Sequence, residues 1–338
     1  MTGWATARLT VDLERYLTRR VTIRNTAGGR GYDQGVRTFD CPLCGERKGR
    51  GWLSVTGWTA GCFNLGCAAN ERLDGGAAEW VARVERITRP EAWQFLLREF
   101  RGAPTARAPV PERGDDWVTF PKEVRWLRDL SPTSPLTRGA AGFLQRQWGL
   151  GWSQAAVWGL GSCWSGPYAR RIVIPICMPG PVAFQARALL PGQEPKYRTS
   201  AYMKECGRPA SAMLFNYRPE LRGAELLLVE GPGDAMRWHR DDRDRRPHAL
   251  ALLGVALTPE KLALIAALEP SRVIPALDNE PAAQARGRLY AEDLRAWGFP
   301  VQVGAWVGGK DSGSGADLER RSAGAGPASL VSDILRGY

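Results

Sequence analysis

The sequence predicts a multidomain α/β protein: a cysteine-bearing N-terminal module, a linker, a small basic α+β subdomain, and a domain with a parallel sheet flanked by helices. Three observations support this. Short apolar segments alternate with helix-like segments from residue 226 onward, the pattern of a parallel sheet with covered faces. Four cysteines stand in two pairs between residues 41 and 67. Residues 101–116 are rich in Pro, Ala and Arg and lack periodicity, so they read as a linker.

Composition narrows the class of partner. The net charge of +11 and the pI of about 9.6 indicate a polyanionic partner, with nucleic acid ahead of a membrane surface. The N-terminus lacks the apolar core of a signal peptide, and no stretch is long and apolar enough to cross a bilayer. We therefore expect a cytoplasmic location and no membrane partner. In that reducing compartment, seven cysteines suggest a metal site and buried thiols rather than disulfides.

The paired cysteines predict a structural zinc site. Cys41 and Cys44 form a C-x-x-C pair, and Cys62 and Cys67 follow on the far side of a predicted hairpin. Two thiolate pairs joined by such strands are typical of tetrahedral zinc in a zinc-ribbon-like module. Four unrelated buried cysteines are the alternative, which the occurrence of two such pairs disfavours. We assign residues 1–100 to this zinc-binding domain.

Helices and charged residues surround the cysteine hairpin. Helices are expected over residues 10–19, over 77–86 and from Pro90 to about residue 100, and the last two should pack on the zinc module. The hairpin also carries basic residues beside tryptophans, an arrangement that suits single-stranded nucleic acid. A solvated face above core tryptophans explains any one of them equally well. These residues are Arg47, Lys48, Arg50, Trp52 and Trp58.

A basic subdomain is expected over residues 117–225. Helices at 137–148 and 154–158 precede a strand at 170–176, and residues 182–189 form its hairpin partner. A polar loop follows. Basic residues gather on this unit, which suggests a phosphate-binding surface, although solvated charge is the default for each residue singly. The group comprises Arg170, Arg171, Arg187, Lys196, Arg198 and Lys204.

The last domain, residues 226–320, should place several carboxylates at one edge of its sheet, and residues 321–338 form a tail. The expected strands are 226–229, 249–253, 273–277 and 301–307, separated by helices at 234–240, 259–268 and 282–297. Ligands of such sheets bind at the carboxyl ends of the strands. The acids that follow strands are Glu230, Asp278, Glu280, Asp311 and Asp317.

These acids together indicate a divalent metal site. Two like charges about 4 Å apart repel by roughly 4 kcal/mol at an effective dielectric of about 20, so a group of them requires cations or protonation. Hard oxygen ligands suit Mg²⁺ or Mn²⁺. Taken singly, Glu230 is also explained by a helix dipole, and Asp278 and Glu280 by turn chemistry.

The motifs resemble a known family. E-G-x-x-D-A from Glu230, D-x-[DE] from Asp278 and the Lys310–Asp311 pair resemble the Toprim domain. The upstream RRIVIPI, VAFQARAL and PKYRTS segments are similar to the basic subdomain of DnaG-type primases, and CPLC…CFNLGC is similar to their zinc-binding domain. The resemblance covers most of residues 38–320 in the family's domain order.

The resemblance implies a DNA primase that makes short RNA primers on a single-stranded DNA template from NTPs, using Mg²⁺ or Mn²⁺. Glu230, Asp278, Glu280 and Asp311 would be catalytic, and Asp317 would be a further metal ligand. The residues implied to contact template, RNA primer or nucleotide are Arg171, Arg187, Lys196, Tyr197, Arg198, Lys204 and Lys310. It implies a replication enzyme of phage or mobile-element type, acting in the bacterial or phage-infected host cytoplasm.

The chain departs from the family pattern at several points. Glu280 replaces the second aspartate of D-x-D, and a Gly/Ser insertion separates Asp311 from Asp317, which puts Asp317 in doubt. Four cysteines stand where many relatives use one histidine. The sequence has no G-x-x-x-x-G-K-[ST] motif, and its tail is short for a helicase-binding domain. We therefore expect a primase that works with a separate replicative helicase or with none.

Other functions remain as alternatives. A non-catalytic recombination mediator that pairs a zinc module with Toprim would bind DNA without incorporating NTPs. A Toprim nuclease would degrade DNA. A topoisomerase is the least favoured, because the chain is short and has no evident strand-passage domain.

Overall fold

The computed structural model describes residues 11–27, 31–32, 35–55, 58–70, 73, 76–100, 118, 120–178, 181–200, 213–240, 242, 246–254, 256–307 and 317–322. The predicted linker lies outside these residues, as do Lys204, Lys310 and Asp311. The backbone of Asp317 is described and its side chain is not.

The cysteine module comprises the described residues up to 100. Its three-stranded antiparallel sheet has the order β1-β2-β3, formed by Val36–Phe39, Gly51–Ser54 and Thr59–Cys62. Three helices accompany it: α1 (Leu13–Arg20), α2 (Gly76–Glu85) and α3 (Arg89–Glu99). The predicted hairpin and all three helices are confirmed.

Local chemistry sets the starts of these helices. Asp12 caps α1 through its side chain, and Thr88 and Glu91 form a reciprocal capping box at α3. Gly76 opens α2 at a φ of +61°, where a Cβ would overlap the carbonyl oxygen of Trp58. Only glycine meets both demands there, so this residue holds α2 close to β3.

The basic subdomain contains a five-stranded antiparallel sheet of order β4-β5-β6-β7-β8. The strands are Val124–Trp126, Gly161–Cys163, Arg171–Cys177, Pro181–Ala188 and Tyr197–Thr199. The helices α4 (Pro135–Trp148) and α5 (Trp152–Val157) pack beside it. The β6–β7 hairpin and both helices are confirmed.

The sequence missed three short strands of this sheet. β4, β5 and β8 have three residues each, too few for an alternation to be visible. The segment expected to be a polar loop places Tyr197 and Arg198 on β8, where they pair with Arg187 and Ala186 of β7. β8 forms because its backbone hydrogen-bonds to β7, and its own polar residues show no strand pattern.

The Toprim-like domain is built on a parallel sheet flanked by helices, as predicted. The strands β9 (Glu225–Val229), β10 (His248–Ala251) and β11 (Arg272–Pro275) have the order β10-β9-β11. The helices α7 (Pro232–Trp238), α8 (Pro259–Ala267) and α9 (Pro281–Ala296) alternate with them.

The end of this domain differs from the prediction. Val301, the residue before β12 (Gln302–Val307), makes an isolated parallel bridge to Val273 of β11, and β12 itself belongs to a separate two-stranded sheet. In that sheet β12 pairs antiparallel with β13 (Asp317–Ser322), which the sequence did not indicate because its residues, DLERRS, are mostly charged. β13 extends two residues into the predicted tail.

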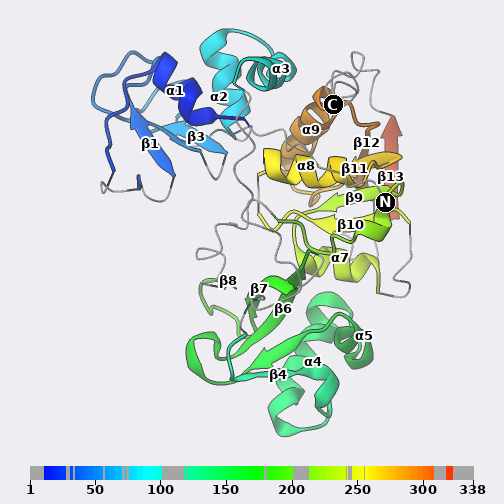
Figure 1. Cartoon of the computed structure of the whole chain (residues 1–338). Coiled ribbons are helices and arrows are strands. Elements are labelled where there is room, and N and C mark those ends of the chain that lie inside the picture. The colour runs from blue at the N-terminus through cyan, green and yellow to red at the C-terminus, as the bar shows by residue number, and fades with distance from the viewer. Residues whose placement is uncertain are drawn as a thin grey trace, which may run out of the picture.

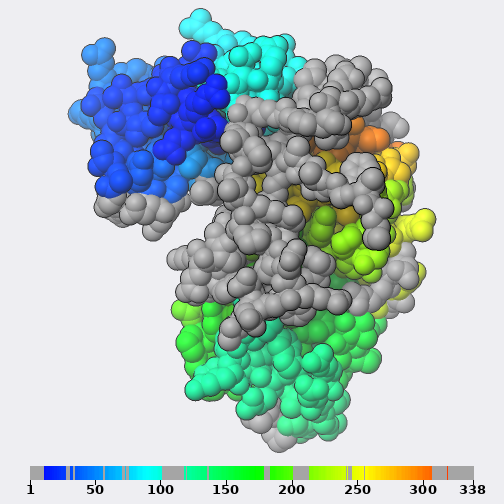
Figure 2. Space-filling model, in the orientation of Figure 1, coloured from blue at the N-terminus to red at the C-terminus, as the bar shows by residue number. Residues whose placement is uncertain are grey.

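Alternate residues of the parallel strands enter two different cores. Leu226, Leu228 and Leu250 share a core with α8, α9 and the cysteine module, whereas Leu227 and Val229 share one with α7 and the basic subdomain. The period of two in a strand explains this division. The Toprim-like domain therefore lies between the other two parts, as Figures 1 and 2 show.

A buried polar contact joins the cysteine module to the Toprim-like domain. Arg89 Nη2 and Trp93 Nε1 of α3 each donate to the carboxylate of Asp293 on α9, both at 2.5 Å. Trp93 also meets Trp297 edge to face at 6.1 Å. Since all four side chains are buried, α3 is held by α9 as well as by its own module. None of the helices in the described part of the chain is long and apolar enough to span a membrane.

Candidate functional site

The four predicted zinc ligands lie together. Cys41 follows β1, Cys62 ends β3, and the Sγ atoms of Cys41, Cys44, Cys62 and Cys67 all lie within 4.8 Å of one another. The Cys41–Cys67 and Cys44–Cys62 sulfur distances are 3.8 and 4.0 Å. A tetrahedron of sulfurs about 2.3 Å from zinc has edges of about 3.8 Å. The cluster therefore has the size of a structural zinc site.

Donors around the sulfurs favour the thiolate form. The Asn64 backbone N–H donates to Cys62, the Asn64 side-chain amide donates to Cys44, and the Ala69 N–H donates to Cys67, each at 3.4 Å. Burial raises the pKa of Cys62 to about 11, whereas at Cys44 hydrogen bonds outweigh the effect of desolvation and lower the pKa to about 7. A cation at the centre would favour the deprotonated form of all four, so the donor set fits zinc.

The hairpin tryptophans divide into one core residue and one surface residue. Trp58 is buried and stacks on Trp93 at 5.0 Å, so it cannot stack on a base. Trp52 is half-buried and stacks on Phe63, whose side chain is 67% exposed. Leu65, at 85%, is also exposed beside the cysteines. The sequence analysis missed Phe63 and Leu65, whose signal is two large apolar residues between Cys62 and Cys67.

Two predicted catalytic acids follow adjacent parallel strands. Glu230 is the first residue after β9, and Asp278 follows β11 by three positions. Because β9 and β11 are hydrogen-bonded neighbours running in the same direction, both acids lie at the carboxyl edge of the sheet. Glu280 is the exposed N-cap residue of α9. Among the described side chains, only the cysteines form a group of three or more potential metal ligands, so the divalent metal site stays a prediction.

Glu230 has an ionic partner that the sequence analysis did not identify. Arg286 on α9 places Nη2 3.4 Å from Glu230 Oε1, and both side chains are partly exposed. The two residues are 56 positions apart, and nothing in their local sequence pairs them. A long, partly exposed ion pair contributes little stability, about 0–1 kcal/mol. Displacing Arg286 from the Glu230 carboxylate, as a bound divalent cation would do, therefore costs little stability.

The turn after Glu230 is fixed by hydrogen bonds to Asp234 and by packing against Trp148. Asp234 Oδ2 accepts a hydrogen bond from the Gly231 N–H at 2.9 Å, and Asp234 Oδ1 pairs with Arg237 at 2.5 Å. Gly233 lies against the indole of Trp148, where a Cβ would stand 2.9 Å from Cδ1 and 3.0 Å from Cε2. α7 therefore begins at Pro232, two residues before the predicted start, because Asp234 closes its first turn.

Tyr197 brings the basic subdomain to the same turn, with Arg187 packed over its ring. The Arg187 guanidinium lies over the Tyr197 ring at 5.0 Å and near Phe143 at 5.8 Å. The Tyr197 hydroxyl lies 3.9 Å from the position a Gly231 Cβ would take. Burial raises the pKa of Tyr197 to about 12, so its hydroxyl remains protonated. Arg187 Nε is buried without a hydrogen-bond partner in the described part of the chain.

The other predicted phosphate contacts have different surroundings. Arg171 is 3% exposed and donates to the backbone carbonyls of Ala186, Glu194 and Pro195, and burial lowers its pKa. It therefore supports the turn before β8, and we leave it out of the proposed surface. Lys196 and Arg198 are exposed.

Solved structures similar to this chain include several DnaG-type primases. The DnaG catalytic domain bound to ssDNA matches with 17% identity and a TM-score of 0.42, covering 56% of this chain and 72% of that one. The zinc-binding and RNA polymerase domains of the Aquifex aeolicus primase match with 16% identity and a TM-score of 0.35, covering 88% and 77%. The RNA polymerase domain of Mycobacterium tuberculosis DnaG matches with 19% identity and a TM-score of 0.44, covering 55% and 73%.

No protein-family profile matches the chain, and no curated protein matches it either. These three structural similarities have TM-scores below 0.5 and identities below 20%. Similarity at this level does not assign an activity, which has to be argued from the residues of this chain.

Proposed function

We propose that this protein is a DNA primase, a nucleotidyltransferase that synthesises short RNA primers on single-stranded DNA from NTPs. One observation carries the proposal. Glu230 and Asp278 follow adjacent parallel strands of the Toprim-like sheet, and Tyr197 of the basic subdomain, with Arg187 over its ring, lies near the Glu230 turn. Carboxylates at a sheet edge, together with basic residues in the neighbouring subdomain, suit a reaction that combines divalent cations with nucleic-acid phosphates.

The reaction would join a 3′-hydroxyl to the α-phosphate of an NTP. The hydroxyl oxygen bonds to phosphorus, the bond to pyrophosphate breaks, and the hydroxyl proton leaves to solvent. Mg²⁺ or Mn²⁺, when bound, lowers the pKa of the hydroxyl and stabilises the leaving oxygen. The proposed ligands are Glu230, Asp278, Glu280 and Asp311, with Asp317 as a further candidate.

The basic subdomain would hold the phosphates. Arg187 is held beside Tyr197, whose hydroxyl lies near Gly231 in the Glu230 turn. Stacking on Tyr197 fixes its guanidinium plane. Lys196 and Arg198 supply exposed charge nearby, and Lys204 and Lys310 belong to the same proposed set. These contacts position the strand and the nucleotide without reading sequence.

The cysteine module would bind zinc and hold the template. The Trp52–Phe63 pair offers an exposed aromatic surface, and Arg50 lies beside it, with its guanidinium donating to Asn64 at 3.1 Å. Aromatic stacking with flanking positive charge binds single strands. The protein would work together with a separate replicative helicase, or without any helicase.

The decisive experiment is template-dependent primer synthesis on random single-stranded DNA, with all four NTPs and Mg²⁺ or Mn²⁺. Glu230→Gln should reduce synthesis by about 100-fold or more, because it removes a metal-binding charge. Glu220→Gln, at an exposed acid outside the site, is the matched control. Full activity of a folded Glu230→Gln protein would refute the site. DNA binding without incorporation would favour a recombination mediator, and loss of labelled DNA would favour a nuclease.

A further inference from the structure

Arg286 on α9 is the ionic partner of Glu230, the first acid of the candidate metal site. Its Nη2 lies 3.4 Å from Glu230 Oε1, and the two side chains are 18% and 31% exposed. Within the described part of the chain, neither side chain makes another hydrogen bond or ion pair. The proposed function assigns Glu230 to a divalent cation. The guanidinium and that cation would therefore compete for one carboxylate.

The helix that carries Arg286 is fixed on both sides of it. Gln284 Nε2 donates to the backbone carbonyls of Leu277 and Asp278 at 3.2 and 3.0 Å, which ties the start of α9 to the segment after β11. Further along α9, the buried carboxylate of Asp293 accepts two hydrogen bonds from α3. A competing cation would therefore displace the Arg286 side chain and leave α9 in place.

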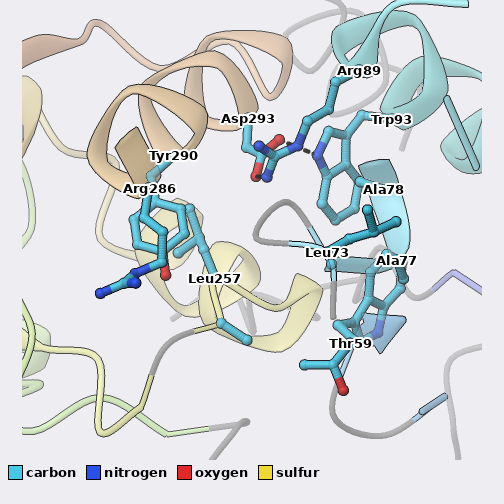
Figure 3. A pocket seen from close by; sticks show the side chains of 13 residues that line it. Thr59, Leu73, Ala77, Ala78, Arg89, Trp93, Leu257, Arg286, Tyr290 and Asp293 are labelled. Atoms are coloured by element: carbon cyan, nitrogen blue, oxygen red, sulfur yellow. Dashed lines mark hydrogen bonds and ion pairs between the residues drawn. The ribbon is translucent and has the colours of Figure 1, made fainter. Parts of the chain in front are cut away.

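The Arg286 side chain has space to turn. It lines a cavity of about 220 Å³ between the cysteine module and the Toprim-like domain, together with Leu257 and Tyr290 (Figure 3). Figure 3 shows its guanidinium on the side of Tyr290 that faces away from Asp293, so a turn would leave the buried contact between the modules intact. Apolar walls such as Leu257 carry no charge to balance a guanidinium. Once released from Glu230, Arg286 therefore needs another anion.

We propose that Arg286 exchanges Glu230 for a phosphate group of the substrate when a divalent cation binds at Glu230, an inference that rests on the proposed function. Mg²⁺ is usually held by one or two carboxylates together with substrate phosphates, so the anion arrives with the cation that displaces Arg286. The planar guanidinium fork matches phosphate oxygens in a bidentate contact. The phosphate belongs either to an NTP or to a bound DNA strand. Arg286 is thus a substrate-binding residue that neutralises Glu230 in the metal-free protein.

The first measurement is calorimetric titration of the zinc-loaded full chain with Mn²⁺ alone. Arg286→Gln should bind Mn²⁺ about three- to fivefold more tightly than the wild type, because a competing, partly exposed ion pair is removed. Arg288→Gln removes the same charge from an exposed position on the same helix and should match the wild type. Glu230→Gln should lose this Mn²⁺ binding. Thermal unfolding reports whether each variant is folded.

Titrations with ATP and with oligo-dT, each at saturating Mn²⁺, identify the source of the phosphate. Arg286→Gln should bind one of the two about tenfold or more weakly than the wild type, because it loses a charge-assisted hydrogen bond. Weaker ATP binding assigns the phosphate to an NTP, and weaker oligo-dT binding assigns it to a strand.

Arg286→Lys should recover part of that affinity, because the ammonium keeps the charge and lacks the fork. The inference is overturned if Arg286→Gln binds Mn²⁺ as the wild type does or more weakly, since Arg286 then only holds Glu230 in position. It is also overturned if ATP and oligo-dT both bind Arg286→Gln as tightly as the wild type. If wild type and Glu230→Gln bind Mn²⁺ equally, or if neither binds it, the proposed metal site fails together with the inference.

Discussion

Replacing Gly233 with alanine should disturb the Glu230 turn through a single steric contact. A Cβ at this position would stand 2.9 and 3.0 Å from two carbons of the Trp148 indole and closer still to Nε1. Favourable carbon contacts lie at about 3.5–4.0 Å. Trp148 is 4% exposed and packs on Phe143 at 5.3 Å, so the ring cannot move aside. Overpacking of this kind costs about 1–3 kcal/mol, more than the gain in helix propensity of at most about 1 kcal/mol.

We therefore expect Gly233→Ala to lower the free energy of unfolding by about 1–2 kcal/mol in urea. Primer synthesis should fall further, by about 10- to 100-fold, because a shift near 1 Å in a positioned group is that costly. Gly287→Ala is the matched control. It lies inside α9, where a Cβ would stand 4.0 Å from Leu277, and it should be neutral or stabilising by up to about 1 kcal/mol.

A double-mutant cycle isolates the contact. Trp148→Phe removes part of the ring that a Cβ at Gly233 would meet, so Gly233→Ala should cost less in that background, with a coupling energy above about 0.5 kcal/mol. The reasoning is refuted if Gly233→Ala matches Gly287→Ala in both stability and activity. It is also refuted if the cost of Gly233→Ala is the same with either residue at position 148.

Three further outcomes are expected. Chelation of zinc, or Cys67→Ser, should abolish zinc binding and open residues 11–100 to proteolysis, because a structural zinc contributes about 10–16 kcal/mol; Cys177→Ser, at an exposed thiol, should retain full zinc content. Phe63→Ala should weaken binding of single-stranded DNA by about 5- to 100-fold in fluorescence anisotropy, since stacking contributes about 1–3 kcal/mol per base, whereas Leu190→Ala, also exposed, should not. Burial raises the pKa of Asp293 from 3.8 to about 6. Between these pH values the folded state holds a proton on Asp293 that the unfolded state releases. The free energy of unfolding of the wild type, relative to that of Asp293→Asn, should therefore fall as pH rises from 4 to 6. If urea unfolding gave the same difference in the free energy of unfolding between wild type and Asp293→Asn at pH 4 and at pH 7, the raised pKa of Asp293 would be contradicted.

Sequence patterns predicted the elements that have length and periodicity. The α4 and α9 helices, the β6–β7 hairpin and the alternation of strands and helices after Leu226 were all readable, because burial of one face imposes a period on such segments. The short strands β4, β5 and β8, and the charged β13, were not. Their pairing energy comes from neighbours distant in the sequence, so their own residues carry little signal.

The candidate site divides in the same way. The motif around Glu230 and the four cysteines could be identified from spacing, because metal ligation and strand-end turns require given residue types at given intervals. Which arginines have a structural role could not be predicted from the sequence. Arg171 is buried on backbone carbonyls while Arg187 keeps a buried Nε without a partner in the described structure, although both are arginines on neighbouring strands.

By itself, the sequence determined the modules, their order and the acids at the ends of the parallel strands, since each is encoded by residues close together in the chain. Only the tertiary structure decided which residues serve those acids and what lies between the modules. Arg286 meets Glu230 across 56 positions, and Arg89 meets Asp293 across 204. Contacts at such separations depend on how helices pack on a sheet, and no local pattern records that packing.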